Sequence, residues 1–264
     1  MSAAAPPVTA WLAACLPDAA IRLAQAWSAP CFQFDIDTAQ AGLDLGRLEH
    51  IVAGLPLAAA PGASPHALRR RQLAYLGGRL CAERALAAAG LAQPCGVGRG
   101  GAGQPLWPRG WSGSISHNAT RAFAVAAARQ GRHDLGIDVE QLVDARTRRA
   151  IEQVCMGQDE VALVAAAPDP GLAATALFAA KEAYYKAIHV AVGRFVDFRE
   201  MVVTGLDAGA GTAGIVLALA PAPACALPPA RVRIVVCGGM VLAATAPGYM
   251  AREGAGHDCT GLAT

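Results

Sequence analysis

The sequence predicts an α+β fold made of two similar halves related by a pseudo-two-fold axis. Two observations indicate this organisation. A helical segment followed by two strand-like segments fills the first half, and a strand, helices and hairpins fill the second. A polar turn at 129–134 separates the two. We therefore place the N-terminal half at residues 1–131, the C-terminal half at 132–250 and a loose tail at 251–264.

The elements of the first half follow from their periodicity. Residues 31–37 (CFQFDID) alternate between apolar and polar side chains, which predicts a strand. From His66 to Ala89 the leucines recur with a helical period, and Gly90 suits the end of a helix. A loop rich in glycine and proline follows at 94–113. Two further strands are predicted at 112–117 and 121–128, joined by a short polar turn.

The second half starts with a predicted strand at 135–140. One helix is predicted from about 145 to 163 and a stronger one from 173 to about 190, with the breaker APDPG at 167–171 between them. The remainder is predicted to be all β. The Gly238–Gly239 pair between two apolar runs is typical of a tight hairpin turn.

Composition narrows the class of protein. The 54% hydrophobic and 16% charged residues exclude a disordered chain, and a net charge of +2 gives no reason to expect nucleic-acid or membrane-surface binding. Eight cysteines without a C-x-x-C pair are typical of reduced thiols. Prolines interrupt the longest uncharged stretch, and no basic segment precedes an early apolar run. We expect a soluble cytoplasmic protein.

The GIDVE segment at 136–140 carries the first candidate site. In a strand, Asp138 and Glu140 point to the same face, while Ile137 and Val139 pack into the core. Two adjacent carboxylates repel each other unless a cation lies between them. Taken alone, D-x-E is more often an acidic face of an exposed edge strand.

The FAAKEAYYKA segment at 178–187 adds a third carboxylate. A helix places Glu182 and Lys186 four residues apart on one face. The ordinary interpretation is a surface ion pair, but the aromatic neighbours make the segment unlike a solvated face. Three carboxylates together predict an all-oxygen site for Mg²⁺, with Mn²⁺ as the alternative.

A third group of residues suits phosphate binding. His117 ends a predicted strand beside Ser116, and glycines in the 98–105 segment (GRGGAGQP) allow close approach of the backbone to a ligand. Arginine forks match phosphate oxygens. Each feature alone also has an ordinary structural explanation: the histidine could be a hydrogen-bonding turn residue, and the arginines could lie on a solvated helix face. The arginines are Arg71, Arg79 and Arg99.

Together these segments resemble one family, the 4′-phosphopantetheinyl transferases, and within it the type that activates surfactin and enterobactin synthetases. The resemblance covers about residues 66–245, and GIDVE followed some forty residues later by F-x-x-KE-x-x-YKA is its most specific part. The matching segments are RRRQLAYLGGRLCAERAL (69–86), GQPLWPRGWSGSISH (103–117), LGIDVEQ (135–141) and FAAKEAYYKAIHVAVGRFVDF (178–198).

The resemblance implies a two-half fold and roles for individual residues in the C-terminal half. Asp138, Glu140 and Glu182 would bind Mg²⁺ on the pyrophosphate of coenzyme A, the co-substrate. The catalytic set would be Glu182, as general base directly or through water, together with Lys186 and Asp138. Lys186 would also counter the pyrophosphate charge, and Lys181 would contact the same phosphates.

The resemblance places the nucleotide end of coenzyme A in the N-terminal half. Ser116 and His117 would contact the adenosine 3′-phosphate, and Gly103, Gln104 and Pro105 would line the adenine pocket. Several relatives have lysine where Gln104 stands, so Arg99 would compensate for a missing charge. Arg71, Arg79 and Arg99 would supply further cationic contacts.

The implied reaction transfers 4′-phosphopantetheine to a serine hydroxyl of an apo acyl or peptidyl carrier protein, with release of 3′,5′-ADP. A monomer is expected, since the two halves would build the site within one chain. Three alternatives stay open: a Mg²⁺-dependent hydrolase of coenzyme A or a nucleotide, a non-catalytic binding module, and a structural protein. Fatty-acid, polyketide, nonribosomal-peptide and siderophore carriers are all compatible with the sequence.

Overall fold

A computed structural model describes residues 29–37, 39, 64–93, 95–101, 103–129, 135–209, 212–219 and 230–245. The predicted boundary between the halves at 131/132 and the predicted tail at 251–264 lie outside these residues. Within them the chain is α+β, as predicted, and the strands and main helices occur close to the expected positions.

In the first half, one long helix covers one face of an antiparallel sheet with the strand order β1-β5-β4. Gly77 and Gly78 permit this contact, because a larger residue would clash with the sheet. A Cβ atom at Gly77 would lie 2.2 Å from the Phe34 ring, and one at Gly78 would lie 2.7 Å from Ile115. Ser64 caps the helix by accepting a hydrogen bond from the Ala67 N–H. The elements are β1 (Cys31–Asp35), α5 (Pro65–Ala88), β4 (Trp111–His117), β5 (Arg121–Ala128) and the short pair β2 (Gly98–Arg99) and β3 (Pro105–Leu106).

The second half places three helices beside a sheet with the strand order β6-β10-β9-β8-β7. Gly238 and Gly239 both have positive φ, 58° and 75°, so the predicted tight turn between β9 and β10 is confirmed. The elements are β6 (Ile137–Gln141), α6 (Ala145–Cys155), α7 (Gln158–Ala165), α8 (Pro170–Val192), the 3₁₀ turn η1 (Phe198–Glu200), β7 (Met201–Gly209), β8 (Thr212–Leu219), β9 (Ala230–Cys237) and β10 (Met240–Thr245).

The single helix predicted at 145–163 is wrong, because the chain forms two helices there. Met156 is extended, with φ −121° and ψ 144°, which ends α6. Gly157 then starts α7, and the Glu160 carboxylate accepts a hydrogen bond from the Gly157 N–H at 3.0 Å. The apolar period continues through both helices, so periodicity alone does not reveal the break.

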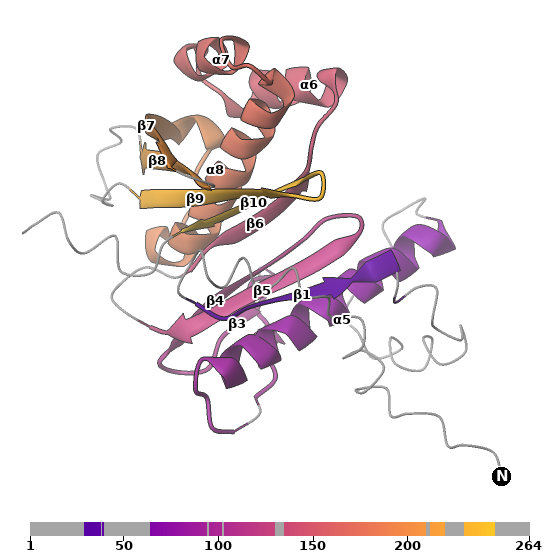
Figure 1. The fold of residues 1–264 in the computed structure, drawn as a ribbon. Helices are drawn as coiled ribbons and strands as arrows, with labels where there is room; N and C mark the ends of the chain where they lie inside the picture. Colours follow the sequence, from indigo (N-terminus) through magenta and orange to yellow (C-terminus); the bar gives the residue numbers. More distant parts are fainter. Residues whose placement is uncertain are drawn as a thin grey trace, which may run out of the picture.

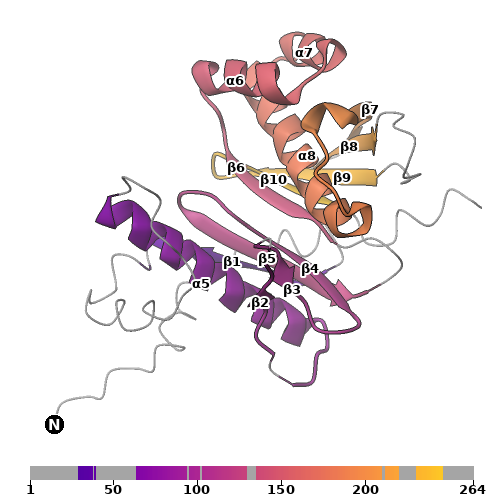
Figure 2. The ribbon, with the colours of Figure 1, turned by 180° about the vertical axis from the view of Figure 1, so that it is seen from behind.

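The two sheets meet through a shared apolar core. Phe123 and Val125 of β5 pack with Ile137 and Val139 of β6 and with Leu242 of β10. In Figure 1, α5 lies below the first sheet and α6 and α7 lie at the top, beyond the second sheet; Figure 2 shows the same layers from behind. The junction of the two sheets is where β4, β6 and α8 come together.

The structure also bears on two expectations from composition. Cys31, Cys81, Cys95 and Cys155 are free thiols. None of the helices in the described ranges combines the length and apolar character of a membrane span.

Candidate functional site

Strand β6 turns its two carboxylates toward α8, as the alternation of GIDVE predicts. Asp138 and Glu140 pair with Ala243 and Val241 of β10, and these two partners belong to the core that α8 covers. Asp138 is buried, with 4% of its surface exposed. An ionised carboxylate at this depth requires a cation or several hydrogen-bond donors.

Helix α8 brings its own charged side chains to the same place. The approach is very close at Gly136, where a Cβ atom would lie 1.8 Å from the Ala183 carbonyl oxygen. Further along, the Val143 N–H donates to the Thr175 hydroxyl at 3.2 Å. These contacts hold helix and strand side by side, so Glu182 and Lys186 face the carboxylates of β6.

Lys186 is the centre of the site's hydrogen bonds. Its ammonium donates to Asp138 Oδ1 at 2.6 Å, to Ser116 Oγ at 3.1 Å and to the Ile137 carbonyl at 3.2 Å. The Ser116 hydroxyl in turn donates to Asp138 Oδ1 at 2.8 Å. All three ammonium protons are therefore used, and residues of both halves meet at one carboxylate oxygen.

The carboxylates influence one another strongly. Burial, and then the charge of Asp138, raise the pKa of Glu140 to about 7, with Glu182 adding to the effect and Lys186 opposing it. Burial also raises the pKa of Glu182, partly offset by Lys186. Burial is thus the main cause of both raised pKa values, and the neighbouring carboxylate of Asp138 adds to it.

The donor set fits a hard cation such as Mg²⁺. Asp138 Oδ2 is buried and has no hydrogen-bond partner, although Oδ1 has two. Carboxylate oxygens are the ligands that Mg²⁺ and Mn²⁺ prefer. No three His, Cys, Asp or Glu side chains among the described residues are already gathered as a metal cluster. The three carboxylates are nevertheless close enough to influence one another's pKa, and Lys186 is the cation that pairs with Asp138.

Strand β4 holds the edge of β6 with side-chain hydroxyls. Ser112, Ser114 and Ser116 accept hydrogen bonds from the backbone N–H groups of Leu135, Ile137 and Val139, at 2.8, 3.0 and 3.3 Å. Alternate residues of β4 point to one face, so every second position of SGSIS meets every second N–H of β6. We call these three residues the serine ladder.

The other face of β4 borders a pocket of about 220 Å³ beside α5. Its walls combine guanidinium groups, an imidazole and a glycine-containing loop, a lining suited to a phosphorylated nucleotide. The structure thus brings six of the predicted nucleotide-end residues together: Arg71, Arg79, Arg99, Gly103, Pro105 and His117.

The pocket carries positive charge without a full set of partners. The Arg79 guanidinium lies 4.8 Å from the centre of the Tyr75 ring, and its Nε is buried without a hydrogen-bond partner in the described chain. Burial lowers the pKa of His117, and Lys186 and Arg71 lower it further, while Asp138 opposes them. The pKa of His117 therefore depends on charges in both the pocket and the carboxylate site.

Two predicted nucleotide contacts do not line this pocket. Ser116 lies on the opposite face of β4 from His117 and is committed to Asp138, Lys186 and Val139. Gln104 folds over its own loop, where its side chain covers Gly100. The resemblance implied a phosphate contact for Ser116, whereas the structure gives it a place among the carboxylates.

The expectation that Lys181 contacts the phosphates is wrong. Lys181 is fully buried, and its ammonium donates to Glu160 at 2.6 Å, to the Cys155 carbonyl at 2.7 Å and to the Phe198 carbonyl at 3.1 Å. This pair joins α6, α7, α8 and η1. Unlike the partly exposed Lys186, Lys181 is enclosed by the fold and donates all three protons within it, so its contacts are structural.

Sequence reasoning missed three residues that line the pocket, Ala74, Tyr75 and Ile115. A usable signal existed for all three. Ala74 and Tyr75 fall one helical turn from Arg71 or Arg79, so the helix period places them on the same side. Ile115 follows from the alternation of β4, two residues before His117.

Comparison with known proteins agrees with this geometry. Residues 60–127 match the 4′-phosphopantetheinyl transferase N-terminal domain, and residues 134–231 match the 4′-phosphopantetheinyl transferase superfamily. The first range contains the pocket and the second the carboxylates and Lys186. The chain belongs to the 4′-phosphopantetheinyl transferase superfamily.

Individual relatives are moderately similar. Enterobactin synthase component D of Salmonella typhimurium is 38% identical over 142 residues, 53% of this chain and 57% of that protein. The 4′-phosphopantetheinyl transferase Npt of Nocardia iowensis is 34% identical over 153 residues, 55% of this chain and 67% of that protein. The 4′-phosphopantetheinyl transferase PptT of Mycobacterium tuberculosis is 29% identical over 135 residues, 51% and 59% of the two chains. The match thus spans little more than half of the Salmonella protein.

Proposed function

We propose that this protein transfers the 4′-phosphopantetheine group of coenzyme A to a serine hydroxyl of an apo carrier protein and releases 3′,5′-ADP. The observation that carries the proposal is the position of Ser116 and His117. These consecutive residues point to opposite faces of β4, one to the carboxylates and one to the cationic pocket. A nucleotide that carries both a 3′-phosphate and a pyrophosphate needs two neighbouring anion sites, and the two faces of β4 would supply them.

Asp138, Glu140 and Glu182 would hold Mg²⁺, with Mn²⁺ as a substitute. The ion would neutralise charge on the pyrophosphate oxygens as the phosphorus is attacked. The buried, unpartnered Asp138 Oδ2 supports this assignment, and so does the raised pKa of Glu140, which follows from burial and from the charge of Asp138.

The chain's own residues account for the proton and the charge. The serine oxygen of the carrier attacks the β-phosphorus, a new O–P bond forms, and the bond from that phosphorus to the oxygen of 3′,5′-ADP breaks. Glu182 takes the serine proton, directly or through water. Its raised pKa makes it a stronger base than an ordinary glutamate. Lys186 adds positive charge beside the departing phosphate.

The cationic pocket would bind the nucleotide end of coenzyme A. Arg71, Arg79 and His117 would contact the 3′-phosphate, with Arg99 as a further cation and Gly103 and Pro105 beside the adenine. Burial of Arg79 Nε without a partner supports a ligand here, since an unpaired buried donor is costly.

The relatives suggest which carrier to test first. One is named enterobactin synthase component D, so we propose peptidyl carrier domains of siderophore synthases as first substrates. Exposed arginines of α6, such as Arg146 and Arg149, suit an acidic carrier surface. We also infer a pseudo-two-fold relation between the halves and a monomeric, cytoplasmic enzyme; light scattering on the purified protein would check the monomer.

Intact-mass analysis of apo-carriers incubated with the protein, coenzyme A and Mg²⁺ tests the proposal. The expected result is a mass gain of one phosphopantetheine group and release of 3′,5′-ADP. Release of 3′,5′-ADP while the carriers keep their apo mass would instead favour a hydrolase. Neither product with any carrier would favour a binding module, and Glu182→Gln is the control for a contaminating activity.

A further inference from the structure

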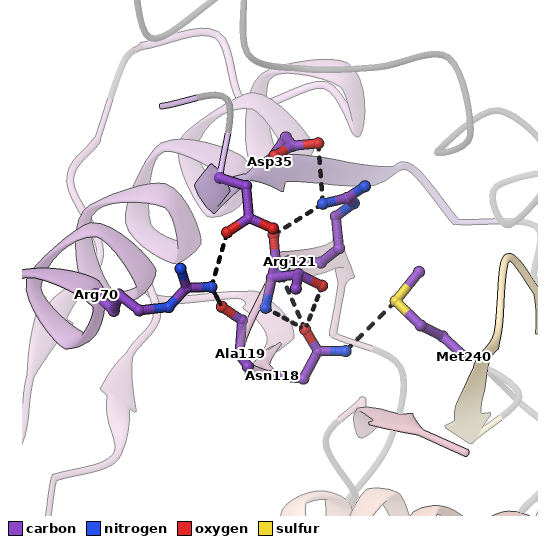
Figure 3. Close-up of polar contacts among 8 residues, drawn as sticks. Asp35, Arg70, Asn118, Ala119, Arg121 and Met240 are labelled. Carbon is purple, nitrogen blue, oxygen red and sulfur yellow. Dashed lines mark hydrogen bonds and ion pairs between the residues drawn. The ribbon is translucent and has the colours of Figure 1, made fainter. Parts of the chain in front are cut away.

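Arg70 lies next to a pocket residue but does not line the pocket. On α5 it precedes Arg71, yet its guanidinium turns toward the β4–β5 turn. There it donates to the Ala119 carbonyl and pairs with Asp37 Oδ1 at 2.8 Å. Figure 3 shows this fork between the helix and the turn. Arg70 therefore ties α5 directly to the segment that follows His117.

The turn itself is tightly organised. Asn118 Oδ1 accepts hydrogen bonds from the Thr120 N–H and the Arg121 N–H, both at 2.9 Å. Arg121 pairs with Asp35 of β1 at 2.9 Å, and the Ile36 N–H donates to the Thr120 carbonyl at 2.9 Å. In Figure 3, dashed lines connect Asp35, Arg121, Asn118 and Met240 in series, and Arg70 contacts Ala119 of the same turn. We call residues 118–121 the clamped turn.

The clamped turn also touches the second half. The Asn118 side-chain amide lies 3.4 Å from the Met240 sulfur, at the start of β10. The turn thus has fixed neighbours on α5, on β1 and on the hairpin of the other half. His117 directly precedes the clamped turn, so the contacts of the turn also restrict the position of His117.

We propose that Arg70 is a positioning residue for recognition of the 3′-phosphate. It acts by holding the clamped turn, and with it His117, at a set distance from Arg71. The inference rests on the proposed function, because the 3′-phosphate is the group that His117 and Arg71 are taken to bind. Those two residues come from different elements, so their separation depends on what joins α5 to β4.

The relationship has a specific consequence for ligand choice. A phosphate binds most tightly when its cationic partners already hold their bound positions, since no free energy is then spent on ordering their side chains. Loosening the clamped turn should weaken contacts to the 3′-phosphate and leave the remainder of the pocket intact. Loss of a purely structural link would weaken binding of every nucleotide alike.

Calorimetric binding of two nucleotides to the intact protein separates these outcomes. Adenosine 3′,5′-bisphosphate carries the 3′-phosphate, and adenosine 5′-phosphate is the same molecule without it. The wild type should prefer the bisphosphate. Arg70→Met should reduce that preference about tenfold, through weaker binding of the bisphosphate alone. Arg70→Lys, which keeps a cation, should recover part of it.

Two further variants complete the experiment. Arg69→Met removes a neighbouring charge that makes no hydrogen bond or ion pair within the described chain, and it should keep the wild-type preference. Asp37→Asn loosens the same fork from its other side and should lower the preference less than Arg70→Met does; it also serves if Arg70→Met folds poorly. An unchanged preference in Arg70→Met, or an equal loss for both nucleotides, overturns the inference. A wild type without any preference would contradict the proposed pocket itself.

Discussion

Lys186 and Asp138 form a 2.6 Å ion pair in which the carboxylate is almost completely buried and the ammonium is partly exposed. Ser116, from the other half, donates to the same carboxylate oxygen. The pair therefore couples the charge balance of the site to the contact between the halves. Several measurable consequences depend on this coupling.

Removing the ammonium should cost both stability and activity. Lys186→Met leaves Asp138 buried without its cation, which we expect to lower the free energy of unfolding by ~1–3 kcal/mol. Carrier modification should fall by about a hundredfold or more, since positive charge at the reacting phosphate is lost. Urea unfolding and intact-mass rates measure the two effects. The double variant Lys186→Met/Asp138→Asn should regain stability but not activity; no regain would mean that the pair does not couple.

The pKa of Glu140 predicts how stability changes with pH. Its folded-state pKa of about 7 exceeds the ordinary 4.5, so between these values the folded protein binds more protons than the unfolded chain. Stability from this group is complete below pH 4.5 and is lost as the pH rises through about 7. Urea unfolding in the absence of divalent ions should show this slope. Glu140→Gln should flatten it, and a wild-type slope in that variant would contradict the assignment.

Close packing of α8 on the start of β6 makes Gly136 hard to replace. A Cβ atom there would lie 1.8 Å from a backbone oxygen of α8, which cannot move without moving the helix. Gly136→Ala should therefore destabilise the protein by more than ~3 kcal/mol. Gly101 has open space around its Cβ position, so Gly101→Ala should stay within ~0.5 kcal/mol. Thermal melting of the two variants makes the comparison, and similar values would refute the steric explanation.

The buried Lys181–Glu160 pair should behave as a structural element. Lys181→Met leaves a buried carboxylate unpaired, which typically costs ~3–5 kcal/mol. Glu160 also accepts hydrogen bonds from the Gly157 and Val203 N–H groups, so Lys181→Met/Glu160→Gln should recover part of the loss. Urea unfolding measures both. A stable Lys181→Met protein with impaired nucleotide binding would restore the phosphate role that its contacts argue against.

Local patterns were sufficient to predict most of the fold and much of the site. The strand around Asp138 and the helix that carries Glu182 follow from periods of two and 3.6 residues. Lys181 shows why more was not possible: consecutive helical residues point about 100° apart, and sequence does not reveal which side faces the core. Ser116 is a similar case, because strand alternation separates it from His117 but does not tell which face meets β6. Gly157 interrupts a helix where the apolar pattern continues.

The serine ladder satisfies backbone N–H groups along the edge strand β6 of the second sheet. Among the strands that the structure describes, β6 is the last on its side of the sheet, and an outer strand with free N–H groups can pair with another polypeptide. Here three hydroxyls accept hydrogen bonds from the N–H groups of Leu135, Ile137 and Val139, so these donors are not free to pair with an added strand. The same residues that bring the two halves together thereby also occupy donors that strand addition along β6 would need.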